Sequence, residues 1–283
     1  MMINKAYLEI TNVCNLSCSF CHKTKRQKKF MSAEEFDILT DRLRGKVQYL
    51  FFHLMGEPTL HPLLSEFVKK ASEKGFLPML TTNGALLSKC GADLLSSPFY
   101  KISISLHAPA ANPAFADPAY LDNCADFALR ASEKGIYTVL RLWNLGSEDE
   151  KTNEAVLARL HEKFPEEWKP MRGGDSYRLH SRLFLEFGDR FDWPDLAAPS
   201  IGESGDCFCH GLRDQFGVLV DGSVVPCCLD SEGIVTLGNL FESEIDDILA
   251  SPRARAIYDG FTRRRAVEEL CRRCGYAKRF SKK

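Results

Sequence analysis

Short apolar, β-branched or aromatic runs alternate with stretches of helical periodicity along the first two thirds of the chain. The apolar runs cover Tyr7 to Ile10, Val47 to Leu54, Phe76 to Thr81, Ile102 to Leu106, Ile136 to Trp143 and Leu179 to Phe187. Strands that alternate with helices pair in parallel through right-handed crossovers. The six units therefore predict an α/β fold, with a partial (β/α)6 barrel favoured over a closed eightfold barrel.

Two Ser-x-x-Glu stretches predict where crossover helices begin. Ser32 to Glu35 and Ser147 to Glu150 both have the capping-box pattern, in which hydroxyl and carboxylate satisfy each other's backbone donors. Between them, His61 to Lys74 carries apolar residues on one helical face and charged residues on the other. We expect these helices to cover the sheet.

The pattern changes after Pro165, where Gly and Pro become frequent up to Gly205. We place a domain boundary there, with a barrel at residues 1–204 and a small hairpin-plus-helix, cluster-binding domain at residues 205–283. Two short apolar runs separated by Asp221-Gly222 predict a hairpin in which both turn residues adopt positive φ. Ser243 to Leu249 and Arg253 to Tyr258 are expected to be helical.

Composition and charge narrow the class of protein. The chain has 283 residues, of which 45% are apolar and 27% charged, as in globular proteins, and its formal net charge is -1. Such a balance gives no general electrostatic reason to bind nucleic acid or an anionic membrane. No apolar run has the length of a signal peptide or a bilayer span, so we expect a cytoplasmic protein with no membrane partner.

Cysteine is the residue type that carries most information. The eleven cysteines are an odd number, which argues against a fully paired disulfide framework. Cys90 and Cys124 fall in helical patterns and are expected to be packing residues. The others form two groups, which suits metal ligation in a reducing compartment: Cys14, Cys18 and Cys21, and Cys207, Cys209, Cys227, Cys228, Cys271 and Cys274.

The first group has the spacing Cys-x3-Cys-x2-Cys in a polar loop after the first predicted strand. A four-iron cluster normally takes four thiolates, so three thiolates leave one iron open to a ligand that is not protein. The plainer alternatives are a partial zinc site or buried free thiols.

This spacing, Phe20 before the third cysteine, Gly56-Glu57-Pro58 and Thr82-Asn83-Gly84 together resemble the radical SAM superfamily. The resemblance implies a 4Fe-4S cluster on Cys14, Cys18 and Cys21, with S-adenosylmethionine on the open iron. In that family one electron splits the cofactor to a 5'-deoxyadenosyl radical, which removes a hydrogen atom from a substrate.

The resemblance also implies contacts to S-adenosylmethionine. Gly56, Glu57 and Pro58 match the family's Gly-Gly-Glu motif, with Met55 in place of the first glycine, and Glu57 and local backbone oxygens would accept hydrogen bonds from the amino group. Phe20 would lie near the adenine. A Gly-Glu-Pro turn is also an ordinary strand-to-helix connection, and Phe20 could be a simple loop hydrophobe.

Later strands supply further candidate contacts. Asn83 would lie beside the cofactor, Ser103 or Ser105 would bind ribose hydroxyls, and Arg141 would bind the cofactor carboxylate in bidentate fashion. Asn-Gly is a turn dipeptide wherever it occurs, and a strand arginine can equally pair with an acidic side chain.

Polar side chains at strand ends lie where the substrate should bind, although most such histidines are structural. We therefore assign no catalytic residue among His53, His107, Trp143 and Asn144.

The second cysteine group offers six thiols for what we expect to be one four-ligand site. Adjacent extended residues point to opposite sides, so Cys227 and Cys228 should not both reach one cluster, whereas geometry does not choose between Cys207 and Cys209. The region resembles the SPASM/twitch extension of radical SAM enzymes. Matching that pattern implies an auxiliary 4Fe-4S cluster, where spacing alone would permit zinc, on Cys209, Cys227, Cys271 and Cys274.

The expected function is reductive cleavage of S-adenosylmethionine and hydrogen abstraction from a peptide or small metabolite. An auxiliary cluster makes an oxidative outcome the first expectation, with a radical lyase or epimerase as one alternative and a non-catalytic, metal-stabilised binding protein as another. The family's chemistry needs a flavodoxin- or ferredoxin-like electron donor. The run Lys23 to Lys29 could dock such an acidic partner, although charge runs are usually solvated faces.

Overall fold

The computed structural model describes residues 3–112, 114–115, 117–200 and 207–280 of the chain. The strands are β1 (Lys5–Leu8), β2 (Tyr49–Phe51), β3 (Leu77–Thr82), β4 (Lys101–Ser105), β5 (Tyr137–Leu145), β6 (Lys169–Pro170), β7 (Ser176–His180), β8 (Leu183–Asp189), β9 (Gln215–Val218), β10 (Ser223–Val225) and β11 (Gly238–Asn239). The α-helices are α1 (Ala33–Leu43), α2 (Leu64–Glu73), α3 (Leu87–Leu95), α4 (Tyr120–Glu133), α5 (Asn153–Lys163), α6 (Ile245–Ala250), α7 (Pro252–Thr262) and α8 (Glu269–Arg272). Short 3-10 helices cover Pro58–Leu60, Glu148–Thr152 and Gly275–Phe280.

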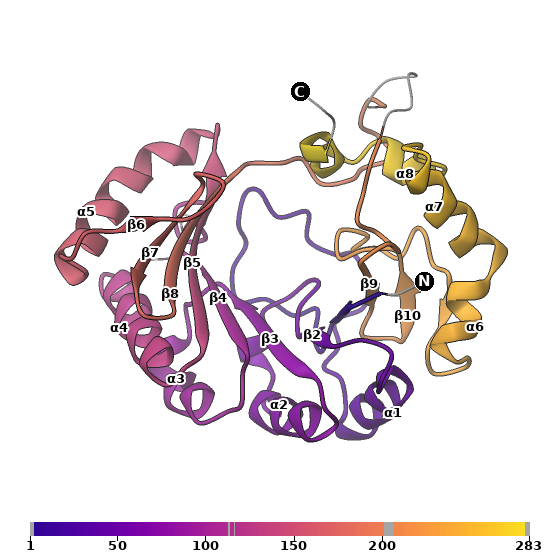
Figure 1. The fold of residues 1–283 in the computed structure, drawn as a ribbon, viewed down its shortest axis with the longest axis horizontal. Helices are drawn as coiled ribbons and strands as arrows, with labels where there is room; N and C mark the ends of the chain where they lie inside the picture. Colours follow the sequence, from indigo (N-terminus) through magenta and orange to yellow (C-terminus); the bar gives the residue numbers. More distant parts are fainter. Residues whose placement is uncertain (1–2, 113, 116, 201–206, 281–283) are drawn as a thin grey trace.

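The strands join in one curved sheet, in the order β11-β10-β9-β1-β2-β3-β4-β5-β8-β7-β6. Its six central strands, β1 to β5 and β8, pair in parallel. Figure 1 shows the strands along the inner side of an arc and α1 to α5 along its outer side. The α/β fold with an open, partial barrel is therefore confirmed.

The core between sheet and helices forms from the apolar faces that the sequence pattern predicts. Phe36 of α1 and Phe67 of α2 are fully buried and stack with ring centroids 4.1 Å apart. Ser32 caps α1 in the predicted capping box, with reciprocal hydrogen bonds to Glu35. The helical pattern and the cap thus agree on where α1 begins and which face it buries.

The second predicted capping box is wrong. Ser147 donates its hydroxyl hydrogen to the Asn144 carbonyl, and the Glu150 carboxylate accepts from the Gly146 amide at 2.7 Å. These bonds stabilise a 3-10 turn instead, and α5 begins only at Asn153. Serine competes for local backbone partners, which is why the same four-residue pattern can form either structure.

The run Leu179 to Phe187, predicted as one strand, is two. The chain turns at Ser181-Arg182, so that β7 and β8 pair antiparallel, and only β8 joins the parallel set beside β5. Arg182 fixes the turn by donating to the Gly135 carbonyl at 2.7 Å and by lying over the Tyr137 ring. Three consecutive polar residues inside the run, His180-Ser181-Arg182, were the signal for this turn.

The C-terminal hairpin is present, with a turn that differs from the prediction. β9 and β10 pair antiparallel, but among the described residues only Gly222 of the turn pair has positive φ, at 84°. The Leu219 amide still donates to the Ser223 carbonyl at 2.9 Å, so the hairpin closes over three residues instead of two.

β9 also pairs in parallel with β1, so the hairpin extends the barrel sheet past its first strand. The predicted domain boundary at residues 204 and 205 lies outside the described residues, and the division into two domains stays a prediction. No helix in the described part of the chain has both the length and the apolar character needed to cross a bilayer.

Candidate functional site

The first cysteine group lies in the long loop between β1 and α1. The loop packs against the segment that follows β4: the Ser19 amide donates to the Ala111 carbonyl at 2.7 Å, and the Cys18 sulfur lies 3.5 Å from the Ala108 carbonyl oxygen. The carboxyl ends of parallel strands share one edge of the sheet, where ligands bind in open α/β folds. The loop therefore holds its thiols above the strand ends.

The three thiols are close enough to influence one another's charge. Burial raises the pKa of Cys18 to about 11, and the negative charges that Cys14 and Cys21 would carry add to this. Burial likewise raises the pKa of Cys14, to which Glu57 and Cys21 contribute. Bound iron would reverse this balance, because a cation keeps coordinating thiols deprotonated. Three thiols in one loop match in number the three protein ligands expected here, and their ligation of a cluster stays a prediction.

Gly56 packs against the backbone of the cysteine loop. Its φ is 76°, and a Cβ atom there would lie 2.5 Å from the Thr11 carbonyl oxygen and 2.8 Å from that of Val13. The next amide, of Glu57, donates to the same Val13 oxygen at 2.8 Å. Only glycine permits this approach, so the Gly-Glu-Pro turn supports the base of the loop.

Glu57 is buried, and protein groups already occupy its carboxylate. Its oxygens accept hydrogen bonds from the Thr59 amide and hydroxyl at 3.1 and 2.7 Å, from the Thr82 hydroxyl at 2.7 Å, and from the Asn83 amide at 2.7 Å. Burial raises the pKa of this carboxyl, and the hydrogen bonds oppose that rise. In this geometry Glu57 fastens the end of β3 to the turn, and its contact with a cofactor amino group stays a prediction.

Asn83 connects the end of β3 to the cysteine loop. Its side-chain amide donates to the Asn15 side-chain oxygen at 2.8 Å, next to Cys14. The Tyr120 hydroxyl donates to the Asn83 carbonyl at 2.8 Å and thereby joins this strand end to α4. The predicted cofactor-side residues Gly56, Glu57 and Asn83 are thus brought together around one loop.

The other predicted contacts lie on neighbouring elements. The centroid of the Phe20 ring lies 5.2 Å from that of the His107 ring. The Arg190 guanidinium lies over the Phe20 ring, 5.0 Å from its centroid. Ser103 is buried in β4, where its register partner on β5 is Val139. Ser105, two residues on, faces Arg141 instead.

Five thiols of the second cysteine group surround one small cavity of about 30 Å³. They are Cys207, Cys209, Cys227, Cys271 and Cys274. Burial raises the pKa of Cys209 to about 11, and the negative charges that Cys274 and Cys207 would carry add to the effect. The four predicted ligands all belong to this set, and the choice of four among five stays a prediction.

A second cavity, of about 170 Å³, lies between this cysteine group and the barrel strands. We call it the central cavity. Cys209, Cys227 and Cys274 line both cavities, whereas Cys228 lines only the central one. Half of its remaining lining residues are Tyr, Phe or Trp, and the set comes from β1, β2, β3, β5 and β9, from loops, and from the C-terminal 3-10 segment: Tyr7, Phe51, His53, Thr81, Arg141, Trp143, Phe191, His210, Gln215, Leu229, Tyr276 and Phe280.

Two of the four polar strand-end residues line the central cavity. His53 is held neutral, because burial, reinforced by the charge of Arg141, lowers its pKa to about 3. Trp143 lines the same wall. His107 instead accepts a hydrogen bond from the Trp143 amide at 3.3 Å, and Asn144 pairs with the Asn153 side chain, so these two support the backbone.

Sequence reasoning missed several cavity residues. Tyr7 is one residue of an apolar strand, and its neighbour Leu8 faces the helical side, so alternation along β1 was the available signal. Phe191, Tyr276 and Phe280 lie in irregular or 3-10 segments, where no periodicity shows which way a side chain points.

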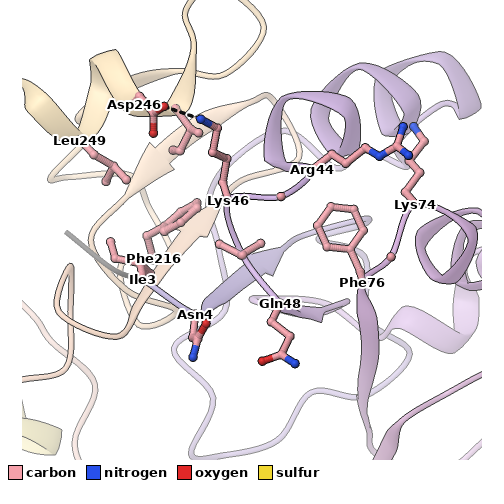
Figure 2. Close-up of a pocket in the computed structure, with 14 residues that line it drawn as sticks. Ile3, Asn4, Arg44, Lys46, Gln48, Lys74, Phe76, Phe216, Asp246 and Leu249 are labelled. Atoms are coloured by element: carbon pink, nitrogen blue, oxygen red, sulfur yellow. Dashed lines mark hydrogen bonds and ion pairs between the residues drawn. The ribbon is translucent and has the colours of Figure 1, made fainter.

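A larger groove, of about 580 Å³, lies at the opposite ends of the strands (Figure 2). Asn4, Gln48 and Phe76, which line it, directly precede β1, β2 and β3. Lys46 at its rim forms an ion pair with Asp246. None of the predicted site residues lines this groove, so the central cavity is the better candidate site.

Comparison with known families and proteins agrees with this geometry. Residues 8–160 match the model of the Radical SAM superfamily, and residues 207–275 match SPASM, an iron-sulfur cluster-binding domain. A tungsten-containing aldehyde ferredoxin oxidoreductase cofactor-modifying protein of Pyrococcus furiosus is 36% identical over 86 residues, which cover 29% of this chain and 24% of that protein. A probable GTP 3',8-cyclase of Metallosphaera sedula is 32% identical over 113 residues, 35% of this chain and 32% of the relative. The chain thus aligns with only about a quarter to a third of the length of these relatives.

Solved structures match over nearly the whole chain. BtrN in complex with AdoMet and 2-DOIA superposes with a TM-score of 0.63 at 17% identity, covering 97% of this chain and 93% of BtrN. The enzyme anSMEcpe with bound AdoMet gives 0.63 at 17% identity, covering 99% and 88%. SuiB of Streptococcus suis gives 0.61 at 16% identity, covering 91% and 68%.

At these identities the structural matches show the shared fold, and the family models show the family. More than half of the chain lies within the Radical SAM match. The chain belongs to the radical SAM superfamily, whose cofactors are a 4Fe-4S cluster and S-adenosylmethionine, and it carries a SPASM region for auxiliary iron-sulfur binding.

Proposed function

We propose that this radical SAM enzyme abstracts a hydrogen atom from a small organic substrate held in the central cavity. The observation that carries the proposal is the position of that cavity, with barrel strands on one side and Cys209, Cys227 and Cys274 on the other. A substrate there would lie between the two iron-sulfur sites.

The chain's own residues hold and orient the cofactors. Cys14, Cys18 and Cys21 would bind three irons and leave the fourth for S-adenosylmethionine, and the cluster, once reduced, would supply the electron that splits this cofactor to methionine and a 5'-deoxyadenosyl radical. Two contacts hold the cysteine loop in place. Asn83 donates a hydrogen bond to Asn15 of the loop, and Gly56 packs against the backbone of the loop. Phe20 remains our candidate for the adenine contact, and Ser103 or Ser105 for the ribose contact.

An oxidative outcome is supported by the three cysteines that line both the small cysteine cavity and the central cavity. Loss of a hydrogen atom to the 5'-deoxyadenosyl radical gives 5'-deoxyadenosine and a substrate radical. That radical becomes a two-electron-oxidised product when it loses one more electron and a proton. An auxiliary cluster on Cys209, Cys227, Cys271 and Cys274 would accept the electron, because three of these residues line the central cavity.

The size of the central cavity favours a small substrate over a long peptide. Pockets for drug-sized ligands measure roughly 300–1,000 Å³, whereas this cavity measures about 170 Å³. It suits a small metabolite or a single side chain.

Electron delivery is proposed to occur at the basic run beside the cysteine loop. Lys23, Lys25 and Lys28 are exposed, whereas Lys29 pairs with Glu35. Three exposed lysines next to Cys21 fit an acidic, flavodoxin- or ferredoxin-like donor.

The proposed function is tested by oxygen-free reconstitution, iron counting and an assay for 5'-deoxyadenosine with dithionite. We expect about eight irons per chain, four for each cluster. Replacing Cys14, Cys18 and Cys21 together by alanine should leave about four irons and abolish 5'-deoxyadenosine formation.

Two cysteine variants serve as matched controls. Cys90→Ala removes a thiol that bonds only to the Leu86 carbonyl of its own helix, and it should keep both clusters and full cleavage. Cys271→Ala should lose about four irons yet keep cleavage of S-adenosylmethionine. Cleavage that survives in the triple variant would refute the assignment of the first site.

A further inference from the structure

Three polar atoms around the central cavity have no hydrogen-bond partner among the described residues. They are His53 Nδ1, Arg141 Nε and Trp143 Nε1, and each atom is fully buried. The arginine and tryptophan nitrogens are donors, whereas the histidine nitrogen donates or accepts according to its tautomer. Leaving a buried donor unpaired costs about 1–3 kcal/mol. Two unpaired donors at one cavity therefore indicate that a ligand supplies the missing acceptors.

The charge of Arg141 is only partly neutralised. Glu186, its register partner on β8, forms a long ion pair with it, in which 4.0 Å separate the carboxylate oxygen from Arg141 Nε, too far for a hydrogen bond. Burial is the main cause that lowers the pKa of His53, His107 and Lys101, and the positive charge of Arg141 lowers all three further. No group among the described residues cancels this cation at hydrogen-bond distance.

Arg141 and Trp143 are held in place by their packing. The guanidinium lies 4.7 Å from the centroid of the Trp143 ring. Gly188 of β8 packs against the Trp143 ring, since a Cβ atom on Gly188 would lie 2.9 Å from that ring. The Arg279 guanidinium lies 5.6 Å from the centroid of the same ring. Donors that are fixed before binding lose little entropy when the ligand arrives.

We infer that Arg141 and Trp143 form the binding subsite for the carboxylate of a small, monoanionic substrate. The inference rests on the proposed function, which puts the substrate in this cavity. One guanidinium among the lining residues matches a single negative charge, and guanidinium nitrogens suit carboxylate oxygens. The aromatic walls, which include Tyr7 and Tyr276, would enclose the apolar part of the molecule.

S-adenosylmethionine also carries a carboxylate, for which we first expected Arg141 to be the partner. Gly56, Glu57 and Asn83, the residues predicted to lie beside that cofactor, do not line the central cavity. Arg141 shares it instead with Cys209 and with residues near the C-terminus. This placement favours the substrate as the source of the carboxylate.

Benzoate and benzamide form a matched probe pair, with the same shape and different charge. An apolar cavity of about 150 Å³ can hold benzene, so both probes suit a cavity of about 170 Å³. Equilibrium dialysis of the oxygen-free, reconstituted protein with each radiolabelled probe measures their dissociation constants, and a parallel titration measures that of S-adenosylmethionine.

We expect benzoate to bind about tenfold or more tightly than benzamide, because hydrogen bonds to charged groups contribute about 1.5–3 kcal/mol. Arg141→Gln should remove this preference and leave the affinity for S-adenosylmethionine unchanged. Trp143→Phe keeps the ring, loses one donor and should weaken benzoate alone by about threefold. Arg159→Gln, which removes a guanidinium that pairs with Asp122 of α4 and does not line the cavity, should change nothing.

Equal affinity for the two probes in the unchanged protein would overturn the inference. A loss of S-adenosylmethionine affinity in Arg141→Gln as large as the loss for benzoate would also overturn it, because Arg141 would then serve the cofactor. Failure of the proposed function gives a different result, in which the probes are discriminated but dithionite yields no 5'-deoxyadenosine.

Discussion

Glu9 and Arg26 form a buried ion pair beneath the cysteine loop, with Arg26 Nη2 at 2.6 and 2.8 Å from the two carboxylate oxygens. The same carboxylate accepts the backbone amides of Met55 at 3.2 Å and Val220 at 3.0 Å. One side chain thus joins the cysteine loop, the Gly-Glu-Pro turn and the C-terminal hairpin. Arg26, which we had counted in the basic docking run, faces inward.

Glu9→Gln should destabilise the protein and loosen its first cluster, because it leaves Arg26 buried without a counter-charge. Breaking a buried pair in this way typically costs about 3–5 kcal/mol. Thermal unfolding and iron retention during dialysis are the measurements. Asp246→Asn removes one partner of an exposed pair with Lys46 and should cost less than about 1 kcal/mol. Equal effects of the two substitutions would contradict the structural role of Glu9.

Gly56→Ala should displace the cysteine loop. The new methyl group would meet two carbonyl oxygens of that loop within 3 Å, and positive φ adds roughly 1 kcal/mol of strain for a residue other than glycine. We expect fewer than the normal number of irons after reconstitution. Gly75→Ala separates the two effects, since Gly75 also has positive φ but has nothing within 4 Å of the added Cβ. A normal iron content in Gly56→Ala would show that the contact is not needed.

Reversing the charge of Lys23, Lys25 and Lys28 to glutamate should slow reduction by flavodoxin by about tenfold or more at low salt, because electrostatic attraction chiefly accelerates association. Turnover with dithionite should stay the same, as this small reductant needs no docking surface. The same reversal at the exposed Lys69, Lys89 and Lys151 provides the control. A loss with both reductants would point to damage to the loop and not to docking.

Acid should destabilise the protein through His53. Its pKa is about 3 in the folded protein, against an ordinary value of 6.5, because burial disfavours the charged ring. Between these two values the unfolded chain binds a proton that the folded chain does not, so stability falls as pH falls, by about 1.4 kcal/mol per pH unit. His53→Gln should flatten the decline in melting temperature between pH 6.5 and pH 5.

A His53→Gln profile parallel to that of the unchanged protein would mean that His53 accepts a proton while folded.

Local patterns were enough to predict the barrel strands, the cap at Ser32 and the loop that carries Cys14, Cys18 and Cys21. These features depend on neighbours in sequence, such as alternation, periodicity and turn chemistry. The predictions of a capping box at Ser147 and of one unbroken strand across Ser181-Arg182 were wrong, because several local hydrogen-bonding arrangements compete at these positions. Choosing among them depends on partners such as Gly135, which is distant in sequence.

Contacts between distant segments were the part that sequence alone could not supply. Nothing in Glu57 indicates that Thr82 and Asn83 would occupy its carboxylate, and nothing in Arg141 indicates that its nearest acid would stay 4.0 Å away. Register across strands decides both, and register is a property of the whole sheet.

The parallel pairing of β9 with β1 has a consequence for electron transfer. Each of these strands leads into a cysteine-bearing segment, and hydrogen bonds along Lys5 to Leu8 fix the two strands side by side. Iron centres bound by these two segments would then be separated by a distance that the backbone ladder helps to fix, which would keep the tunnelling distance between them constant. A chain cut before Gln215 would lose this ladder and turn β1 into an open edge, ready to pair with another molecule.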